Sequence, residues 1–296
     1  MSTFVLAHLS DPHLAPVPDP KLYELAGKRL TGYINWRHNR CHFHLRPVLD
    51  RIVADLKAQK ADHVAVTGDL VNLSLAAEFE PARAWLAELG DPRDVTVIPG
   101  NHDAYAWSKR NEALRHWSGF MRDDEPRAND FPFVRRRGAI ALIGLTTGVP
   151  TPPLFATGRL GRRQLAALAG VLDELGNAQL FRIVLIHHPP ITRPGRYLHR
   201  LTDADAFVSV LAQHGAELIL HGHEHLDLVR SIDAPRPIPV VGVASASGAL
   251  GHKHDAASYN LYSIDGAPGA WRCQLVTRGL DGGGNIVERK RANLIG

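Results

Sequence analysis

The sequence is poor in cysteine and has no long hydrophobic run, and each absence excludes a class of protein. Its 296 residues include only two cysteines, Cys41 and Cys273, which lie too far apart for a disulfide framework and suit a reducing compartment. The sequence contains no stretch of about 18 apolar residues, so it does not predict a membrane-spanning helix. Residues 1–8 lack the basic start of a secretory signal. We therefore expect a cytoplasmic protein with a full hydrophobic core.

The chain also lacks a general excess of basic charge. Its formal net charge is +4, but residues 21–46 alone hold six Lys or Arg and one Glu, a local net charge of +5. The remainder is close to neutral, so a broad basic surface for nucleic acid is not expected. The basic residues are interleaved with Leu, Tyr, Ile and Trp, and we interpret residues 16–46 as a basic-aromatic insertion.

Hydrophobic periodicity predicts strands that alternate with helices over most of the chain. The predicted strands are 3–9, 63–67, 94–98, 139–145, 181–186 and 217–220, and the predicted helices are 47–60, 76–89, 161–175 and 202–214. Four further strands, which we expect to be antiparallel, are 226–232, 239–244, 258–264 and 271–277. This order indicates an α/β protein. We expect residues 1–280 to form a single domain and the Gly-rich, charged residues 281–296 to form a loosely held tail.

Five predicted strand ends are followed at once by Asp, Asn or His side chains. Ligands bind at the carboxyl ends of strands in open α/β sheets, so we expect these side chains to meet at one edge. In chain order they are Asp11 and His13, Asp69, Asn101 and His102, His187, and His223 and His225. Carboxylate, amide and imidazole donors together suit Mn²⁺, Fe²⁺/Fe³⁺ or Zn²⁺, and the absence of nearby cysteine argues against a thiolate site.

A pair of such ions, bridged by a carboxylate, is well suited to phosphoryl transfer. The ions orient the phosphorus, offset its negative charge and lower the pKa of a bridging water toward neutrality. The leaving oxygen then needs a general acid, and histidine fills that role near neutral pH. The pattern therefore predicts a metal-dependent phosphoric ester hydrolase.

The ordered motifs resemble those of the calcineurin-like metallophosphoesterase superfamily over residues 3 to about 265. The segments "LSDPHL", "GNHD", "HHPP" and "GHEH" look most like those of bacterial class III cyclic nucleotide and glycerophosphodiester phosphodiesterases. The resemblance implies an α/β four-layer sandwich, in which two mixed β-sheets pack face to face between flanking helices. It also implies a phosphodiesterase that acts on a cyclic nucleotide or related diester and uses a metal-bridging hydroxide as nucleophile.

The same resemblance implies a role for each motif residue. The first metal would be held by Asp11, His13 and His225, the bridge would be Asp69, and the second metal would be held by Asn101, His187 and His223. His102 would act on the substrate as general acid or phosphate contact, and Asp103 would orient His102. His188 is expected to be structural.

The natural substrate stays open at this point. The insertion could pack on the body as a cap, or residues 21–46 could contact a lipid substrate or the anionic inner face of a membrane. Its "KRLTGYINW" segment also resembles enzymes that hydrolyse UDP-2,3-diacylglucosamine, so a nucleotide-lipid pyrophosphohydrolase is an alternative function. Single-stranded nucleic acid is not expected, because the basic segment is short. A metal-binding scaffold without turnover and a homodimer are further alternatives.

Overall fold

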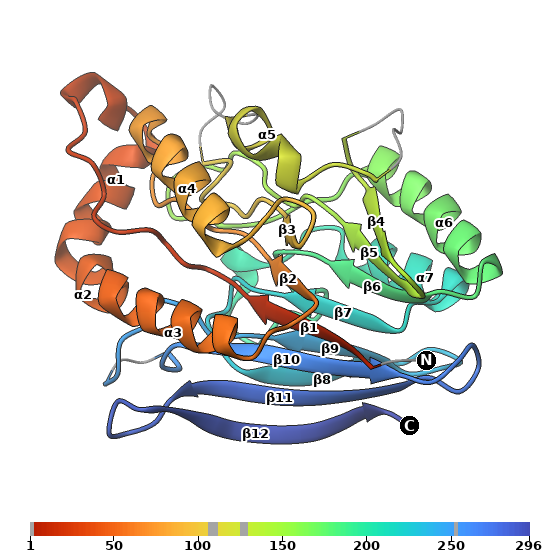
Figure 1. Ribbon diagram of the computed structural model, residues 1–296. Helices are drawn as coiled ribbons and strands as arrows, with labels where there is room; N and C mark the ends of the chain where they lie inside the picture. The colour runs from red at the N-terminus through yellow and green to blue at the C-terminus, as the bar shows by residue number, and fades with distance from the viewer. Residues whose placement is uncertain (1–2, 106–111, 125–129, 252–253) are drawn as a thin grey trace.

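The computed structural model describes residues 3–105, 112–124, 130–251 and 254–296 (Figure 1). The strands are β1 (Phe4–Leu9), β2 (His63–Val66), β3 (Val95–Val97), β4 (Phe133–Arg137), β5 (Ile140–Gly144), β6 (Phe181–Leu185), β7 (Leu218–His221), β8 (Leu228–Ile232), β9 (Ile238–Gly242), β10 (Ser258–Asp265), β11 (Arg272–Leu280) and β12 (Ile286–Ile295). The helices are α1 (Lys28–Asn35), α2 (Cys41–Phe43), α3 (Arg46–Ala58), α4 (Ala76–Leu89), α5 (Glu112–Trp117), α6 (Arg162–Asn177) and α7 (Ala204–His214). Shorter helical turns are η1 (Leu22–Leu25), the π-helical η2 (Trp36–Arg40), η4 (Ser118–Phe120) and η5 (Tyr197–His199).

The strands form two six-stranded mixed sheets. The first sheet has the order β12-β11-β10-β1-β2-β3, and the second has the order β4-β5-β6-β7-β9-β8. Strands β1, β2 and β3 are parallel to one another, as are β5, β6, β7 and β9, while the remaining pairs are antiparallel. The two-sheet sandwich with flanking helices that the resemblance implied is therefore confirmed.

Alternate side chains along a strand separate the layers of the core. On β6, Ile183 and Leu185 belong to a hydrophobic cluster that joins both sheets and continues to α3 and α4. Val184 belongs to a second cluster, in which the second sheet packs against α6 and α7. Figure 1 shows α1 to α4 on one side of the molecule and α6 with α7 on the other. Strand β6 is therefore packed on both faces, as is usual for parallel strands covered by helices.

The β-rich end of the chain differs from the expectation of four successive antiparallel strands. Strands β8 and β9 pair in the second sheet, whereas β10 and β11 pair in the first. Strand β9 also pairs with β7 in parallel. Strand β4 was not predicted, because its run of three arginines hides the buried Phe133 and Val134. Arg135 is itself buried and donates hydrogen bonds to backbone carbonyls, including those of Pro92 and Gly119.

The C-terminal residues correct a second expectation. Residues 286–295, predicted to belong to a loosely held tail, form β12 and pair with β11 along the outer edge of the first sheet (Figure 1). The glycines of this segment turn the chain back: Asp281 accepts hydrogen bonds from the amides of Gly283 and Asn285. The exposed strand needs only one apolar face, so its charged composition resembled that of a tail.

The insertion folds into η1, α1, η2 and α2, and residues 21–46 are called the roof from here on. Its Trp36 and Phe43 are buried. Two backbone hydrogen bonds tie its end to the body, from Leu45 N to Ser247 O (2.9 Å) and from Ala249 N to Phe43 O (2.8 Å). Among the described helices, none combines the length and apolar character needed to cross a bilayer.

Candidate metal centre

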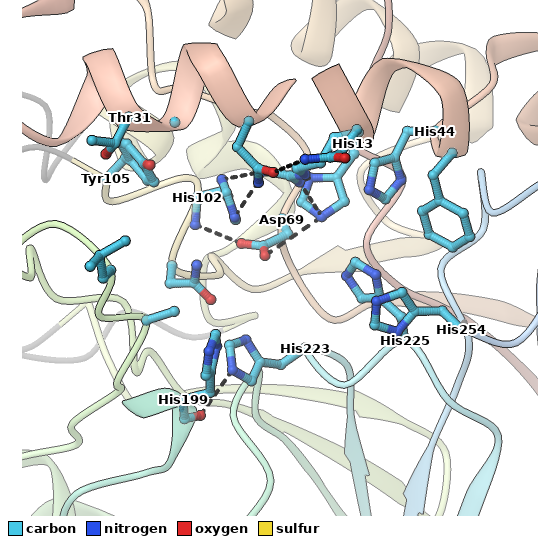
Figure 2. Close-up of a pocket in the computed structure, with 18 of the residues that line it drawn as sticks. His13, Thr31, His44, Asp69, His102, Tyr105, His199, His223, His225 and His254 are labelled. Atoms are coloured by element: carbon cyan, nitrogen blue, oxygen red, sulfur yellow. Dashed lines mark hydrogen bonds and ion pairs between the residues drawn. The ribbon is translucent and has the colours of Figure 1, made fainter. Parts of the chain in front are cut away.

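The predicted ligands converge where strands of both sheets end (Figure 2). Loops after β1, β2 and β3 supply Asp11, His13, Asp69 and Asn101, and loops after β6 and β7 supply His187, His223 and His225. All but His225 are buried. The expected meeting of chain-distant segments at one edge is thus what the structure shows.

Asp11, His13 and His225 form the first group of potential metal ligands. One donor atom from each lies within 4.8 Å of the others. Asp11 Oδ1 is 3.1 Å from His225 Nε2 and 3.9 Å from His13 Nε2. The other oxygen of Asp11 accepts a hydrogen bond from the amide of His223 (3.0 Å), which ties the two sheets together at the site.

Asp69, His187 and His223 form the second group. Asp69 Oδ2 lies 3.2 Å from His187 Nε2, and Asn101 Oδ1 lies 3.2 Å from the same nitrogen. Asp69 Oδ2 is also 3.8 Å from His13 Nε2 of the first group. This carboxylate therefore lies between the two groups, where a bridging ligand would have to be.

The hydrogen bonds of the imidazoles fit a metal site. His13 Nδ1 faces Val71 O, His187 Nδ1 faces Thr67 O, and His223 Nε2 faces His199 O, at 3.3, 2.6 and 2.9 Å. A carbonyl oxygen accepts only from a protonated nitrogen, so the other nitrogen of each ring is the one that can lose its proton and bind a metal. Metal-binding histidines characteristically make such a bond with the nitrogen that does not bind the metal.

Asp69 and His187 each shift the pKa of the other toward its charged form. Burial alone would raise the pKa of Asp69, but the neighbouring His187 and His102 outweigh it and hold that pKa well below its usual range. Burial lowers the pKa of His187, but the Asp69 carboxylate outweighs that effect and raises it to about 9. The ionised Asp69 is the form that a cation would bind.

The backbone at the site is strained, as is common for functional residues. Five of the seven predicted ligands have left-handed φ values between 39° and 69°, namely Asp11, His13, Asp69, His223 and His225. The glycines of the motifs allow close approach. A Cβ on Gly222 would lie 1.9 Å from Ser10 Oγ, and a Cβ on Gly100 would lie 2.2 Å from Asp69 Oδ1.

His102 lies beside Asp69 and borders the cavity above it. Its amide donates to Asp69 Oδ1 (2.7 Å), and its Nδ1 lies 2.5 Å from Asn72 O. Burial and the neighbouring Arg40 lower the pKa of His102 to about 3. The imidazole is therefore neutral in this state, with its proton on Nδ1.

Asp103 does not have the contacts that its predicted role requires. Its carboxylate accepts hydrogen bonds from four amides, those of Asp69, Leu70, Val71 and Gly100, at 2.8–3.1 Å. Burial and the Asp69 carboxylate raise the pKa of Asp103 to about 7. The Asn72 carbonyl orients the His102 ring instead, and Asp103 fixes the loops that carry Asp69 and Asn101. Its side chain accepts one hydrogen bond from its own turn, at Gly100, and three from the loop after β2.

His188 is buried beside His187 but has both ring nitrogens occupied. Nδ1 lies 2.7 Å from Thr147 Oγ1, and Nε2 lies 3.1 Å from Ala156 O. Neither nitrogen is left for a ligand, and its contacts are those of a structural residue. His8 and His221 are also buried, and they contact Thr67 Oγ1 and Gly222 O respectively.

A cavity of about 860 Å³ lies above the ligand groups. The roof covers it, as Figure 2 shows for the helical ribbon above His13 and His102. Sequence reasoning assigned no individual role to several of its lining residues, namely Lys28, Arg40, His44, Tyr105, Phe155, Arg196 and His199. The basic and aromatic composition of residues 21–46 was the signal for Lys28, Arg40 and His44, and the sequence offered none for the other four.

Comparison with known proteins defines the class. The sequence model of the calcineurin-like phosphoesterases matches residues 4–227. The chain belongs to this family. The match ends two residues after His225 and so includes both ligand groups.

Individual relatives are more distant. The chain is 29% identical over 177 residues to a probable cyclic nucleotide phosphodiesterase of Synechococcus sp., an alignment that covers 59% of this chain and 62% of that protein. A dimetal phosphatase from Danio rerio superposes with a TM-score of 0.65 at 14% identity, covering 99% of this chain and 98% of that one. A purple acid phosphatase from yellow lupin (Lupinus luteus) gives 0.61 at 12% identity, covering 97% and 53%. These structures share the fold.

Proposed function

We propose that the protein is a dinuclear-metal phosphodiesterase that acts on a cyclic nucleotide or a related small diester. The observation that carries the proposal is the position of Asp69 between two ligand groups, with His102 beside it at the floor of a large cavity. The Synechococcus relative supports a diester substrate. Mn²⁺, iron or Zn²⁺ suits the mixed oxygen and nitrogen donors.

The residues divide into two ligand sets and a bridge in this proposal. The first set is Asp11, His13 and His225, the second is Asn101, His187 and His223, and Asp69 belongs to both. When bound, the metal pair orients the phosphoryl group, offsets its charge and activates water. The protein contributes a preshaped site: six of these seven residues are buried, and Asp103 holds the loops that carry Asp69 and Asn101.

His102 protonates the leaving oxygen in this proposal. Its Nδ1–H is fixed on Asn72 O, so the proton to be transferred must be carried by Nε2. Burial and the positive charge of Arg40 lower the pKa of His102 to about 3. An anionic phosphoryl group beside the ring offsets the positive charge of Arg40 and raises the pKa of His102. Substrate binding therefore favours the protonated form that can act as the acid.

A substrate panel on the metal-loaded protein tests the proposal. Cyclic AMP, a glycerophosphodiester and bis(p-nitrophenyl) phosphate should be hydrolysed in the presence of Mn²⁺ and not after chelation. A protein that holds two ions yet releases no product from any diester or anhydride would be a metal-binding scaffold, contrary to the proposal.

A nucleotide-lipid pyrophosphate is a second candidate substrate, favoured by exposed apolar side chains around the cavity. Leu22 and Tyr23 on the roof are 90% and 75% exposed, and Leu154 and Tyr197 on the bordering loops are 79% and 68% exposed. Leu30, Ile34, Phe155 and Leu198 are exposed as well, and Leu154 and Phe155 line the cavity. Exposed apolar side chains near a site suit acyl chains or a lipid surface.

Hydrolysis of UDP-diacylglucosamine, compared with cyclic AMP, separates the two candidates. Flotation with anionic vesicles tests lipid contact, and Leu22→Ser should weaken it. Val229→Ser is the matched control, since Val229 is also exposed but lies on β8. Equal flotation of both variants would argue against contact through the roof.

A further inference from the structure

Arg40 brings a partly buried cation from the roof to the predicted metal ligands. Its Nη2 lies 2.9 Å from His13 Nε2, and its Nη1 lies 3.2 Å from His102 Nε2. The guanidinium thus spans a predicted ligand of the first metal and the predicted general acid. No sequence motif singled out this residue among the six basic residues of the roof.

The guanidinium contacts two imidazole rings and forms no ion pair within the described part of the chain. Its hydrogen-bonding contacts are the rings of His13 and His102. Asp69 and Asp11 act on it only at longer range. A partly buried guanidinium that faces the cavity without a carboxylate in contact is well placed to bind an anion. Metal ions bound beside it would increase that need.

The fold places Arg40 firmly. It closes the π-helical turn η2, a conformation often found at functional sites. The amide of His44 donates to Arg40 O (2.8 Å), and the buried Trp36 and Phe43 flank the turn. The roof end is also bonded to residues 247–249. The guanidinium is therefore held over the cavity by a packed element.

The other basic residues of the roof have different surroundings. Arg29 donates to the carbonyls of Leu73 and Ser74 and fastens α1 to the body. Arg37, three positions before Arg40, is fully exposed and contacts the Tyr33 hydroxyl. Arg40 differs from both, because its guanidinium lines the cavity and contacts the predicted ligand His13 and the predicted acid His102.

We propose that Arg40 is a substrate-binding residue of the reaction, whose guanidinium binds non-bridging oxygens of the phosphoryl group from the side of the roof. The proposal rests on the proposed phosphoesterase function and deepens it. The planar guanidinium can hold two phosphoryl oxygens at once. Arg40 would thus bind the phosphoryl group from the side opposite the metals. It would favour an anion with a non-bridging oxygen directed toward the roof.

Inorganic phosphate is the probe, because it carries the shared chemistry of all candidate substrates. Its binding to the Mn²⁺-loaded full-length protein is measured by titration calorimetry, and metal content by elemental analysis. Arg40→Met should weaken phosphate binding about 10- to 100-fold, the usual loss for a charged hydrogen-bonding partner, with two ions retained. Arg40→Lys should lie between, since lysine keeps the charge but loses the planar fork.

Arg37→Met is the matched control and should bind phosphate like the wild type. The melting temperature of Arg40→Met should not fall, because the guanidinium forms no ion pair with the described carboxylates that the substitution would break. Phosphate affinity within twofold of the wild type would overturn the proposal. Loss of an ion in both Arg40 variants would also overturn it, since Arg40 would then merely support His13.

The outcome separates this proposal from the proposed function. A protein that binds phosphate through Arg40 yet cleaves no ester would refute the function and leave the Arg40 assignment intact. If the protein cleaves diesters but Arg40→Met binds phosphate as tightly as the wild type, the Arg40 assignment is refuted and the proposed function stands.

Discussion

The floor and the roof of the cavity are built in opposite ways. The floor, residues 10–13, 68–72, 100–103, 187 and 222–225, consists of short loops at strand ends with left-handed ligand residues and almost no exposure. The roof is helical, basic and partly exposed. The floor supplies chemistry that is fixed by residue type, and the roof supplies contacts that depend on packing. Changes to the floor should therefore affect the reaction itself, and changes to the roof should affect which substrates bind.

The largest effect is expected for Asp69→Ala. If Asp69 bridges, both ions should be lost and turnover should fall by about 10³-fold or more, because the site loses the metals and their charge. His225→Ala should mainly weaken the first ion. Elemental analysis of the purified variants gives the answer, with the exposed Asp50→Asn as control. Two ions retained after Asp69→Ala would disprove the bridge.

His102→Ala should leave the metals in place and lower turnover on the order of 10²–10⁴-fold. The effect should shrink for bis(p-nitrophenyl) phosphate, because nitrophenolate leaves without a proton. Steady-state kinetics on a nitrophenyl and an alkyl diester provide the comparison. An equal loss on both would remove His102 as the acid and favour a binding role.

Gly222→Ala tests whether the floor tolerates any added volume. The new Cβ would lie within 2.4 Å of Asp11 Oδ2, so we expect destabilisation by roughly 1–3 kcal/mol and weaker binding of the first ion. Thermal unfolding and metal titration measure the two effects. Gly170→Ala on α6 is the control, where the Cβ meets no atom within 4 Å and should stabilise by about 0.5–1 kcal/mol.

The smallest effect concerns Lys28, which lines the cavity from the roof. Its Nζ donates to Thr151 Oγ1 and Phe155 O, and burial lowers the pKa of Lys28 to about 8. The charge is present below that pH and is lost as pH rises through it. The KM of an anionic diester should therefore increase a few-fold above pH 8, by loss of a Coulomb attraction. In Lys28→Met the inflection should disappear, while Arg37→Met should retain it.

The floor could be predicted from sequence because each ligand follows a recognisable strand end. Asp69 directly follows a buried strand and a glycine, and the strand period alone places it at the edge. The role of Asp103 was wrong, because sequence spacing does not show which amides lack a partner. For the roof, the sequence predicted only a basic and aromatic composition and not which side chains face the cavity. Whether Arg37 or Arg40 turns inward depends on the burial of Trp36 and Phe43 against the body.

The order in which the chain pairs its strands has a consequence for biosynthesis. Strand β1 lies between β2 and β10, so its second neighbour is made only after residue 265 has been synthesised. Asp11 likewise meets a residue 214 positions further along the chain, His225. Such long-range contacts slow folding. They also mean that the first ligand group cannot form before residue 225 has been synthesised, nor the second before residue 223, so the first-made segments hold neither group alone.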